Sequence, residues 1–267
     1  MVMCSSQVTK NARNRTKNKT IMGEREPMPY IVLNSDGSAE DYFLGRRFSD
    51  NLIIEIRPDG EVLPRTERLA GLVQGRSVLH IGCCDHTPIL KQRLADGLWL
   101  HGRLTKVAQR CLGIDIDSKA VEQVKSTTGF DNLIAADVTK PGIDEIASSQ
   151  WDLALFGDVL EHVHAPVDFL SAFRENYGSS VNKIIVSVPN NMRGGNATGA
   201  LRNRETINSD HCFEFSPFTL AKVVALSGFR LEQFYYSSFA AVEFPKSIIY
   251  KRRPYLAHTL IAVASLA

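Results

Sequence analysis

The strongest constraint on this chain is a series of short apolar runs separated by segments of helical periodicity. The runs are four to seven residues long and occupy residues 77–82, 111–116, 133–136, 151–156, 183–188, 230–236 and 259–264. Continuous apolar runs of this length are typical of strands covered on both faces, and helices between strands are typical of crossover connections. The sequence therefore predicts an α/β fold with one doubly wound, mostly parallel sheet of seven strands.

A different pattern precedes the first of these runs. Residues 52–56 are rich in strand-forming side chains, Pro58-Asp59-Gly60 is a turn signal, and the chain then returns through residues 61–63. This order predicts a small N-terminal β-hairpin that caps the sheet. A length of 267 residues suits one large domain or at most two. Because no internal repeat is present, we expect a single domain over residues 30–267.

The first 29 residues differ in composition from the rest. They hold six Lys or Arg against two Glu, a net charge of +4, which leaves −2 for the remainder of a chain whose total is +2. The segment has few large apolar residues to offset the entropy lost on ordering, which predicts a disordered basic tail. A solvated tail is the simplest interpretation. Contact with nucleic acid or anionic lipid, or a role as an organelle leader, are the alternatives.

The cysteines and the hydropathy bear on location. None of the five cysteines forms a C-x-x-C pair, and their odd number is more typical of reduced thiols than of a disulfide framework. No apolar run approaches the roughly 18 residues that a transmembrane helix needs. The basic N-terminal segment is not followed by the apolar core of a secretory signal. We therefore expect a cytoplasmic protein without a membrane span.

Polar or glycine residues follow each of the first four runs. Gly82 ends the first, Asp115 the second and Asp137 the third, and Gly157 stands at the end of the fourth. Singly, such residues are ordinary turns or helix caps. Ligands of open parallel sheets, however, bind outside the carboxyl ends of the strands. A glycine turn admits a ligand close to the backbone, and an acid ending the next strand accepts from ribose hydroxyls. The ordered set predicts a nucleoside ligand.

These segments resemble the ordered motifs of class I S-adenosylmethionine-dependent methyltransferases. The resemblance runs from about residue 77 to residue 264 and is carried by SVLHIGCCDH, CLGIDIDSKAV, LIAADV, WDLALFGDVLEHVHAPVDFL, IIVSVPNN and SGFRLEQF. The combination of EHV with a later P and FL, followed by VPN, DH and GF, is similar to the small-molecule and glycan methyltransferases of that superfamily. It implies a Rossmann-like transferase that binds S-adenosylmethionine.

The resemblance also implies which residues contact the cofactor. Gly82 and its neighbours would contact the methionine part, Asp115 the ribose, and Asp137 with the Val138 amide the adenine. The full implied set is His80, Gly82, Cys84, Asp115, Ile116, Asp137, Val138 and Gly157. The chain departs from the family at its first loop, which usually has an acidic residue in place of His80 and glycines in place of Cys84 and His86. An apparent insertion at residues 86–101 lengthens the same loop.

Two other nucleotide or thiol chemistries fit less well. A dinucleotide oxidoreductase needs G-x-G-x-x-G after the first strand, and this chain has only Gly82 of that set. A thiol hydrolase would use Cys83 or Cys84 with His86 or His162. Nothing else in the sequence supports a thiol hydrolase. A buried cysteine is more often an inert packing residue than a nucleophile.

The predicted activity is methyl transfer to an oxygen, less readily a nitrogen, of a small or sugar-containing acceptor. His162 or His211 would be the general base. One alternative is methylation of the terminal ribose of RNA, because INSDHCFEF resembles the DH-x-FEW stretch of small-RNA methyltransferases. The basic tail and Arg193, Arg202 and Arg204 would then bind the phosphates of the RNA. The other alternative is a non-catalytic cofactor-binding subunit that binds a partner through the tail and residues 251–253.

A divalent metal is a further prediction. Asp158, Glu161 and His162 are spaced i, i+3 and i+4, which places them on one face of a helical turn, and His211 would close the site. Carboxylates with imidazoles suit Mg²⁺, Mn²⁺ or Zn²⁺. The set resembles the E-x-x-E-H pattern of ubiquinone O-methyltransferases and the metal site of terminal-ribose enzymes, with Asp158 in place of a Glu. Alternatively, Glu161 and His162 simply cap a helix and line the pocket.

Overall fold

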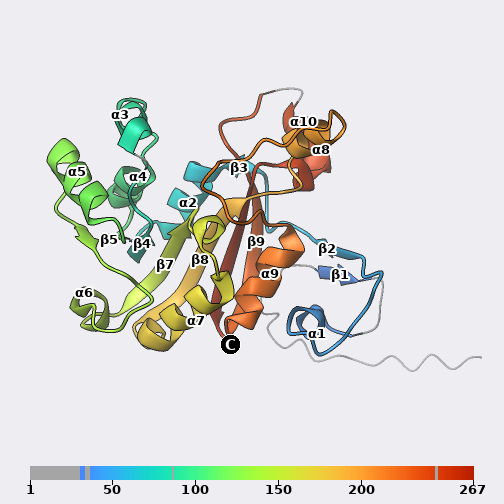
Figure 1. The fold of residues 1–267 in the computed structure, drawn as a ribbon, viewed down its shortest axis with the longest axis horizontal. Helices are drawn as coiled ribbons and strands as arrows, with labels where there is room; N and C mark the ends of the chain where they lie inside the picture. The colour runs from blue at the N-terminus through green and yellow to red at the C-terminus, as the bar shows by residue number, and fades with distance from the viewer. Residues whose placement is uncertain (1–30, 34–36, 86, 244–245) are drawn as a thin grey trace, which may run out of the picture.

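The computed structural model describes residues 31–33, 37–85, 87–243 and 246–267 (Figure 1). The predicted disordered tail, residues 1–29, lies outside the described residues. Among those that are described, no helix combines the length and the apolar character needed to cross a membrane.

The centre of the molecule is an eight-stranded sheet in the order β3-β9-β10-β8-β7-β4-β5-β6. All seven predicted strands are present, and only β10 runs antiparallel to its neighbours. The additional strand is β3, a two-residue segment parallel to β9. The strands are β3 (Leu63–Pro64), β4 (Ser77–Ile81), β5 (Arg110–Asp115), β6 (Leu133–Ala135), β7 (Trp151–Gly157), β8 (Val181–Pro189), β9 (Phe229–Ser238) and β10 (Thr259–Leu266).

The N-terminal cap is an antiparallel pair, but its partners differ from those of the predicted hairpin. β2 (Ile54–Ile56) pairs with β1 (Ile31–Leu33), whereas the returning segment after the turn joins β9. The turn itself explains the difference. Asp59 makes two hydrogen bonds to Phe234 of β9. Its backbone N–H donates to the Phe234 carbonyl at 2.8 Å, and its side-chain Oδ2 accepts from the Phe234 N–H at 2.7 Å. The turn is thereby docked on β9, and Leu63 continues along that strand.

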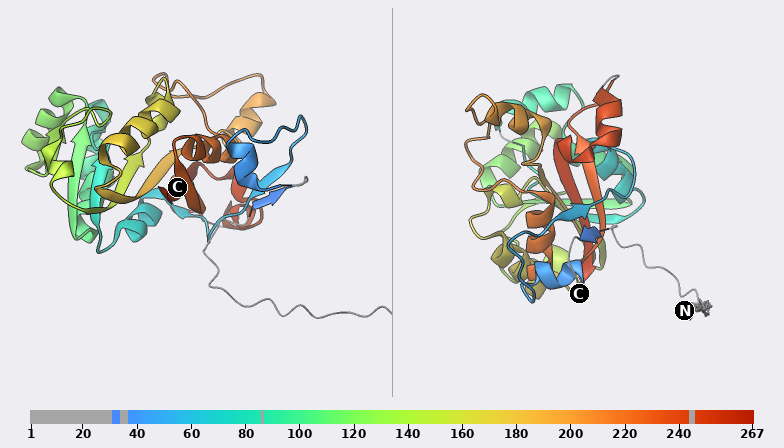
Figure 2. Two further views of the ribbon diagram at one scale, coloured as in Figure 1. Left: turned by 90° about the horizontal axis from the view of Figure 1, so that it is seen from below. Right: turned by 90° about the vertical axis from the view of Figure 1, so that its right-hand side faces the viewer.

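Helices cover both faces of the sheet, as the two views of Figure 2 show. One apolar cluster joins α2 (Arg65–Val73) and α4 (Leu100–Val107) to the sheet through Leu69, Leu104 and Leu155. The opposite cluster includes α7 (Pro166–Tyr177) and α9 (Pro217–Leu226). The remaining helices are α1 (Ala39–Phe43), α3 (Thr87–Ala95), α5 (Ser118–Thr128), α6 (Asp144–Ala147), α8 (Gly194–Ala200) and α10 (Lys246–Arg252), with short 3₁₀ turns η1 (Leu160–His162) and η2 (Pro254–Leu256).

Local chemistry sets the helix ends near the predicted site. Asp117 caps α5, its side chain accepting from the Lys119 and Ala120 amides, and Gly129 ends that helix in the left-handed region at φ 73°. Ser216 and Thr219 form a reciprocal capping box at the start of α9. The caps therefore fix where α5 begins, shortly after β5, and where α9 begins, after the long connection that follows β8.

The docked turn generates a stability prediction. Asp59→Ala leaves the Phe234 N–H at the edge of the sheet without its acceptor, so the free energy of unfolding should fall by about 1–2 kcal/mol. Urea unfolding measures it, with the exposed Asp50→Ala as the matched control. Equal stability of the two variants would contradict the assignment of the turn.

Candidate functional site

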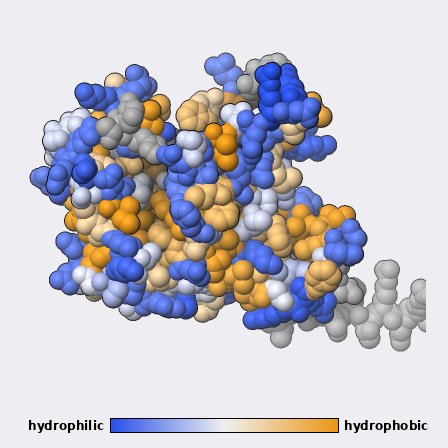
Figure 3. Space-filling view, viewed as in Figure 1, coloured by the Kyte–Doolittle hydropathy of each residue, from blue (hydrophilic) through white to orange (hydrophobic). Residues whose placement is uncertain are grey.

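The candidate site lies at the carboxyl ends of the parallel strands. From β4 the chain moves outward through β5 to β6 and then returns to the other side of β4 at β7, so the strand order reverses between β4 and β7. Ligands of doubly wound sheets bind at this reversal. In the space-filling view the outline is indented between the lobe that carries α3 and the lobe that carries α8 and α10 (Figure 3).

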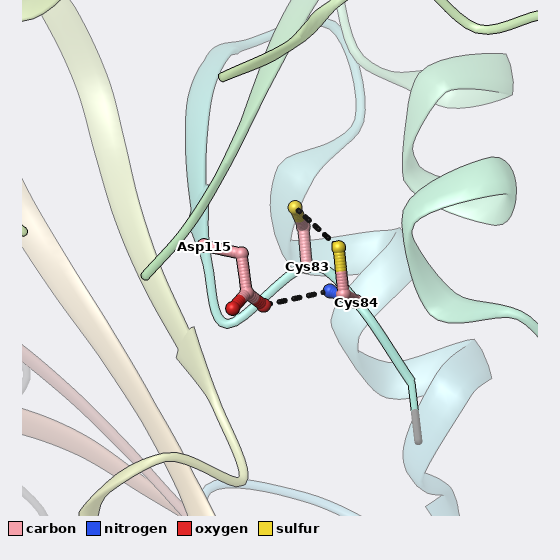
Figure 4. Close-up of side chains that lie close together, drawn as sticks. All are labelled: Cys83, Cys84 and Asp115. Atoms are coloured by element: carbon pink, nitrogen blue, oxygen red, sulfur yellow. Dashed lines mark hydrogen bonds between the residues drawn. The ribbon is translucent and has the colours of Figure 1, made fainter. Parts of the chain in front are cut away.

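The first loop brings Cys84 and Asp115 together. The Cys84 N–H donates to Oδ2 of Asp115 at 3.0 Å, and the Asp117 N–H donates to Oδ1 at 3.1 Å (Figure 4). Two backbone amides therefore hold the Asp115 carboxylate at the end of β5, beside the loop that follows β4. This is the geometry expected of an acid that accepts from a ribose, with further lone pairs left on both oxygens.

Gly82 is required by this loop. Its φ is 70°, and a Cβ atom there would lie 2.4 Å from Cγ2 of Val159. Any side chain would thus separate the β4 loop from the segment that follows β7. The contact places the first loop directly against η1, which begins one residue after Val159.

The predicted adenine end is also in place. The Asp137 carboxylate accepts from the Thr139 amide at 2.9 Å and from its hydroxyl at 2.6 Å, and these bonds lower the pKa of Asp137. Val138 is buried in the core, so only its backbone is suited to a ligand. Ile116 is 73% exposed beside Asp115 and offers an apolar surface to a flat ring. The assignment of these three residues to a cofactor stays a prediction.

The cysteines of the first loop do not favour thiol chemistry. The Sγ atoms of Cys83 and Cys84 are 3.9 Å apart, and Cys83 packs in an apolar cluster with Trp99 and Leu133 (Figure 4). The Cys84 thiol and burial raise the pKa of Cys83 far above its ordinary value. A protonated thiol is a poor nucleophile, which argues against Cys83 as the nucleophile of a thiol hydrolase.

The second cluster joins Glu161, His162 and His211. One candidate ligand atom from each lies within 4.8 Å of the others, and the two imidazole rings meet edge to face at 4.8 Å. Backbone bonds bring the distant His211 there, because the Glu161 carbonyl accepts from the amides of Cys212 and Phe213. The His162 Nδ1 faces the Asp210 carbonyl at 3.1 Å, which requires the proton on Nδ1 and leaves the lone pair of the neutral ring at Nε2.

The electrostatics of this cluster are unusual. Glu161 is fully buried, neither of its carboxylate oxygens has a hydrogen-bond partner, and His211 Nδ1 is equally unpartnered. Burial, followed by the nearby Asp158 carboxylate, raises the pKa of Glu161 to about 9. Burial, followed by the charge of His162, lowers the pKa of His211. A neutral acid thus faces two imidazoles.

The helical reasoning for Asp158 is wrong. Asp158 has a left-handed φ of 59° and precedes η1, so it does not share a helical turn with Glu161. Its Oδ1 lies 3.0 Å from the Ser187 hydroxyl and 3.1 Å from a guanidinium nitrogen of Arg65. Sequence reasoning missed both residues: Arg65 belongs to no motif, and Ser187 lies within the IIVSVPNN segment but was not assigned a role. They reach the site from the start of α2 and from β8.

The sequence expectations for the later segments are partly corrected. The segment of residues 190–209, whose content of Asn, Gly and Arg is typical of a loop, includes the helix α8. Arg202 and Arg204 are exposed after that helix. Arg193, in contrast, is turned inward: its guanidinium lies 3.5 Å from Glu214 and donates to the Thr206 carbonyl. Of the three arginines suggested for phosphates, two are placed on the surface.

No family model and no curated protein match the chain. Similar solved structures include magnesium protoporphyrin IX methyltransferase from Synechocystis PCC 6803 with bound SAH, at 15% identity over 76% of this chain and 82% of that one, TM-score 0.46. The methyltransferase domain of bacterial CtHen1 is 19% identical over 76% and 97%, TM-score 0.48. Small RNA methyltransferase HEN1 is 17% identical over 79% and 27%, TM-score 0.49.

The chain has a doubly wound α/β fold. The strand order, with β10 as the one antiparallel strand of the described central sheet, decides this, and the predicted α/β class is confirmed.

The buried acid generates a pH prediction. The folded pKa of Glu161, about 9, exceeds its ordinary value of 4.5, so the native state holds an extra proton between these values and loses stability as the pH rises through them. In metal-free protein, Glu161→Gln removes this loss and should be more stable than the parent by roughly 3 kcal/mol at pH 7, with no gain near pH 4. Denaturant unfolding in chelator measures both, with the exposed Glu175→Gln as control. A gain independent of pH would refute the assignment.

Proposed function

We propose that this protein is an enzyme that transfers a methyl group from S-adenosylmethionine to a hydroxyl oxygen of a small or sugar-containing acceptor. The observation that carries the proposal is the contact between Gly82 and Val159. It joins the nucleoside-type site at Asp115 to the polar cluster at Glu161. A cofactor held at the first would present its methyl group beside the second.

The Asp115 site and the Glu161 cluster would have different roles in such a reaction. Methyl transfer is a direct displacement, so most of the catalysis is alignment of the acceptor oxygen with the methyl carbon, together with removal of the acceptor's proton. Asp115 and the first loop would fix the cofactor. Burial lowers the pKa of His211, so this imidazole is suited to accept a proton near neutral pH, and His162 lies beside it with Nδ1 facing the Asp210 carbonyl.

The Glu161, His162 and His211 set also fits a divalent metal. A buried carboxylate without partners and a buried imidazole nitrogen without a partner are what a cation would satisfy, and the candidate ligand atoms are already within 4.8 Å. A bound metal would lower the pKa of an acceptor hydroxyl and offset its charge. Asp158 belongs to this set only if it leaves Arg65.

The terminal ribose of RNA is the second candidate acceptor. The observation that favours it is the position of His211, which the segment 207–215 carries into the cluster. The exposed Arg202 and Arg204 lie on the same connection and would meet phosphates. A small sugar-containing acceptor needs no such charges. Labelled methyl transfer into RNA, glycan and small-molecule fractions distinguishes the two.

Cofactor binding is tested by thermal unfolding. S-adenosylmethionine or its demethylated product at a hundred times its dissociation constant should stabilise the protein by about 2.7 kcal/mol. Asp115→Ala removes the ribose acceptor and should abolish most of the shift. The exposed Asp131→Ala should keep it. No shift in the parent protein at millimolar cofactor would refute the proposal.

The metal is tested separately by titration with Mn²⁺, followed by calorimetry and by activity. His211→Ala should lose Mn²⁺ binding while its cofactor affinity, measured in chelator, stays unchanged, and the exposed His164→Ala should keep both. Chelation should abolish activity and added metal should restore it. If activity survives exhaustive chelation, His162 and His211 act as acid–base groups alone.

A further inference from the structure

We propose that His80 and Arg65 form a carboxylate subsite at the reversal of strand order, and that its occupant is the carboxylate of the cofactor's methionine part. The inference rests on the proposed function and adds to it which residues bind the carboxylate end of the cofactor. It starts from a polar atom that the fold leaves without a partner.

That atom is Nε2 of His80. The side chain is 2% exposed on β4, and this nitrogen has no hydrogen-bond partner. It points toward Gly157 on the adjacent strand β7, where a Cβ atom would lie 3.1 Å from it and 3.4 Å from a terminal nitrogen of Arg65. Because residue 157 is glycine, the imidazole of His80, the guanidinium of Arg65 and the Leu100 side chain can all approach the position that a Cβ atom would occupy.

A chain of hydrogen bonds decides which His80 nitrogen carries the proton. Asn132 Nδ2 lies 2.8 Å from the Cys111 carbonyl, which only accepts, so this atom is the amide nitrogen. The same Nδ2 lies 3.3 Å from Nε2 of His101, which must then accept. The neutral His101 ring therefore carries its proton on Nδ1 and donates it to Nδ1 of His80, 3.2 Å away. That leaves the His80 proton on Nε2.

Both rings are neutral in this arrangement. Burial lowers the pKa of His101 to about 4, and burial with the neighbouring ring lowers that of His80 well below its ordinary value. The result is an N–H donor from His80 that faces a cationic donor from Arg65 with no acceptor between them. An acceptor with negative charge satisfies both, and an ammonium group satisfies neither.

The charged groups around Arg65 show how the acceptor enters. Arg65 contacts the Asp158 carboxylate and the Ser187 hydroxyl, and Arg65, Leu100 and the His80 nitrogen all lie within 3.4 Å of the position that a Cβ atom on Gly157 would take. A carboxylate reaches that nitrogen when the guanidinium turns from Asp158 toward it. Arg65 then exchanges one carboxylate for another, which keeps the charge balanced.

The position along the sheet identifies the carboxylate. The strand order β7-β4-β5-β6 places this subsite at the β7–β4 end of the edge, while Asp115 and Asp137 follow β5 and β6. A cofactor with its adenosine at those acids lays its amino-acid end over β4 and β7. The family that the sequence resembles usually has an acidic residue, a hydrogen-bond acceptor, at the position of His80. In this chain the position holds a donor, so it is suited to the carboxylate of the methionine part and not to its ammonium group.

Calorimetry with two nucleosides tests the subsite. S-adenosylhomocysteine has the amino-acid end, and 5′-methylthioadenosine lacks it. His80→Phe and Arg65→Met should each weaken S-adenosylhomocysteine about ten- to hundredfold and change 5′-methylthioadenosine less than about twofold. The exposed His164→Phe should change neither.

The outcomes separate the two proposals. A parent protein that binds neither nucleoside refutes the proposed function. A parent that binds both, with variants that lose the two nucleosides equally or lose neither, refutes the subsite alone.

Nitrogen-15 NMR of the parent protein tests the proton positions without any variant. His101 should be protonated at Nδ1 and His80 at Nε2, and the opposite pattern would overturn the assignment. Asn132→Leu removes the donor that positions these rings. It should shift the ring-nitrogen signals of His101 and reduce the preference for S-adenosylhomocysteine over 5′-methylthioadenosine, which loss of packing alone would not do.

Discussion

The contact between Gly82 and Val159 is the constraint on which the rest of the site depends. A left-handed glycine after β4 lets the segment after β7 lie against the first loop, so two strand ends close on each other at the reversal of strand order. The Asp115 carboxylate stands on one side of that closure and the Glu161 cluster on the other. Neither cluster alone points to group transfer, whereas in the proposed function the closure would bring a cofactor held at Asp115 next to the polar groups of the Glu161 cluster.

The site is built largely from buried polar groups that the protein does not pair. Burying a carboxylate or an imidazole without a partner costs free energy, and such groups are rare unless a ligand completes them. Among the described residues they occur at Glu161, His211 and His80 beside this edge of the sheet, and also at Arg68, Asp85, Arg174 and Ser237. Groups at this edge could be completed by a charged ligand. The free energy of folding that the protein loses by burying them is consistent with a functional constraint.

Much of the fold followed from local pattern, because continuous apolar runs and intervening helical periodicity are set by burial on two faces. The strand ends with Gly82, Asp115 and Asp137 were predictable for the same reason, since their places are defined by where each run stops. The partner of β2 was not, because it depends on the docking of Asp59 against β9, a contact across some 175 residues. Arg65 and Asn132 were equally inaccessible, since their roles arise from tertiary contacts and from no motif.

Asp158 shows how the two halves of the site share one group. Spacing alone placed it with Glu161, but a left-handed backbone turns it toward Arg65 and Ser187 instead. Its charge still raises the pKa of Glu161, so the two carboxylates are coupled without sharing a ligand. If a cofactor carboxylate takes over Arg65, Asp158 is released toward the cluster that a metal would occupy. The affinity of the cluster for a cation would then rise when the cofactor binds, and by linkage the cation would strengthen the cofactor by the same factor.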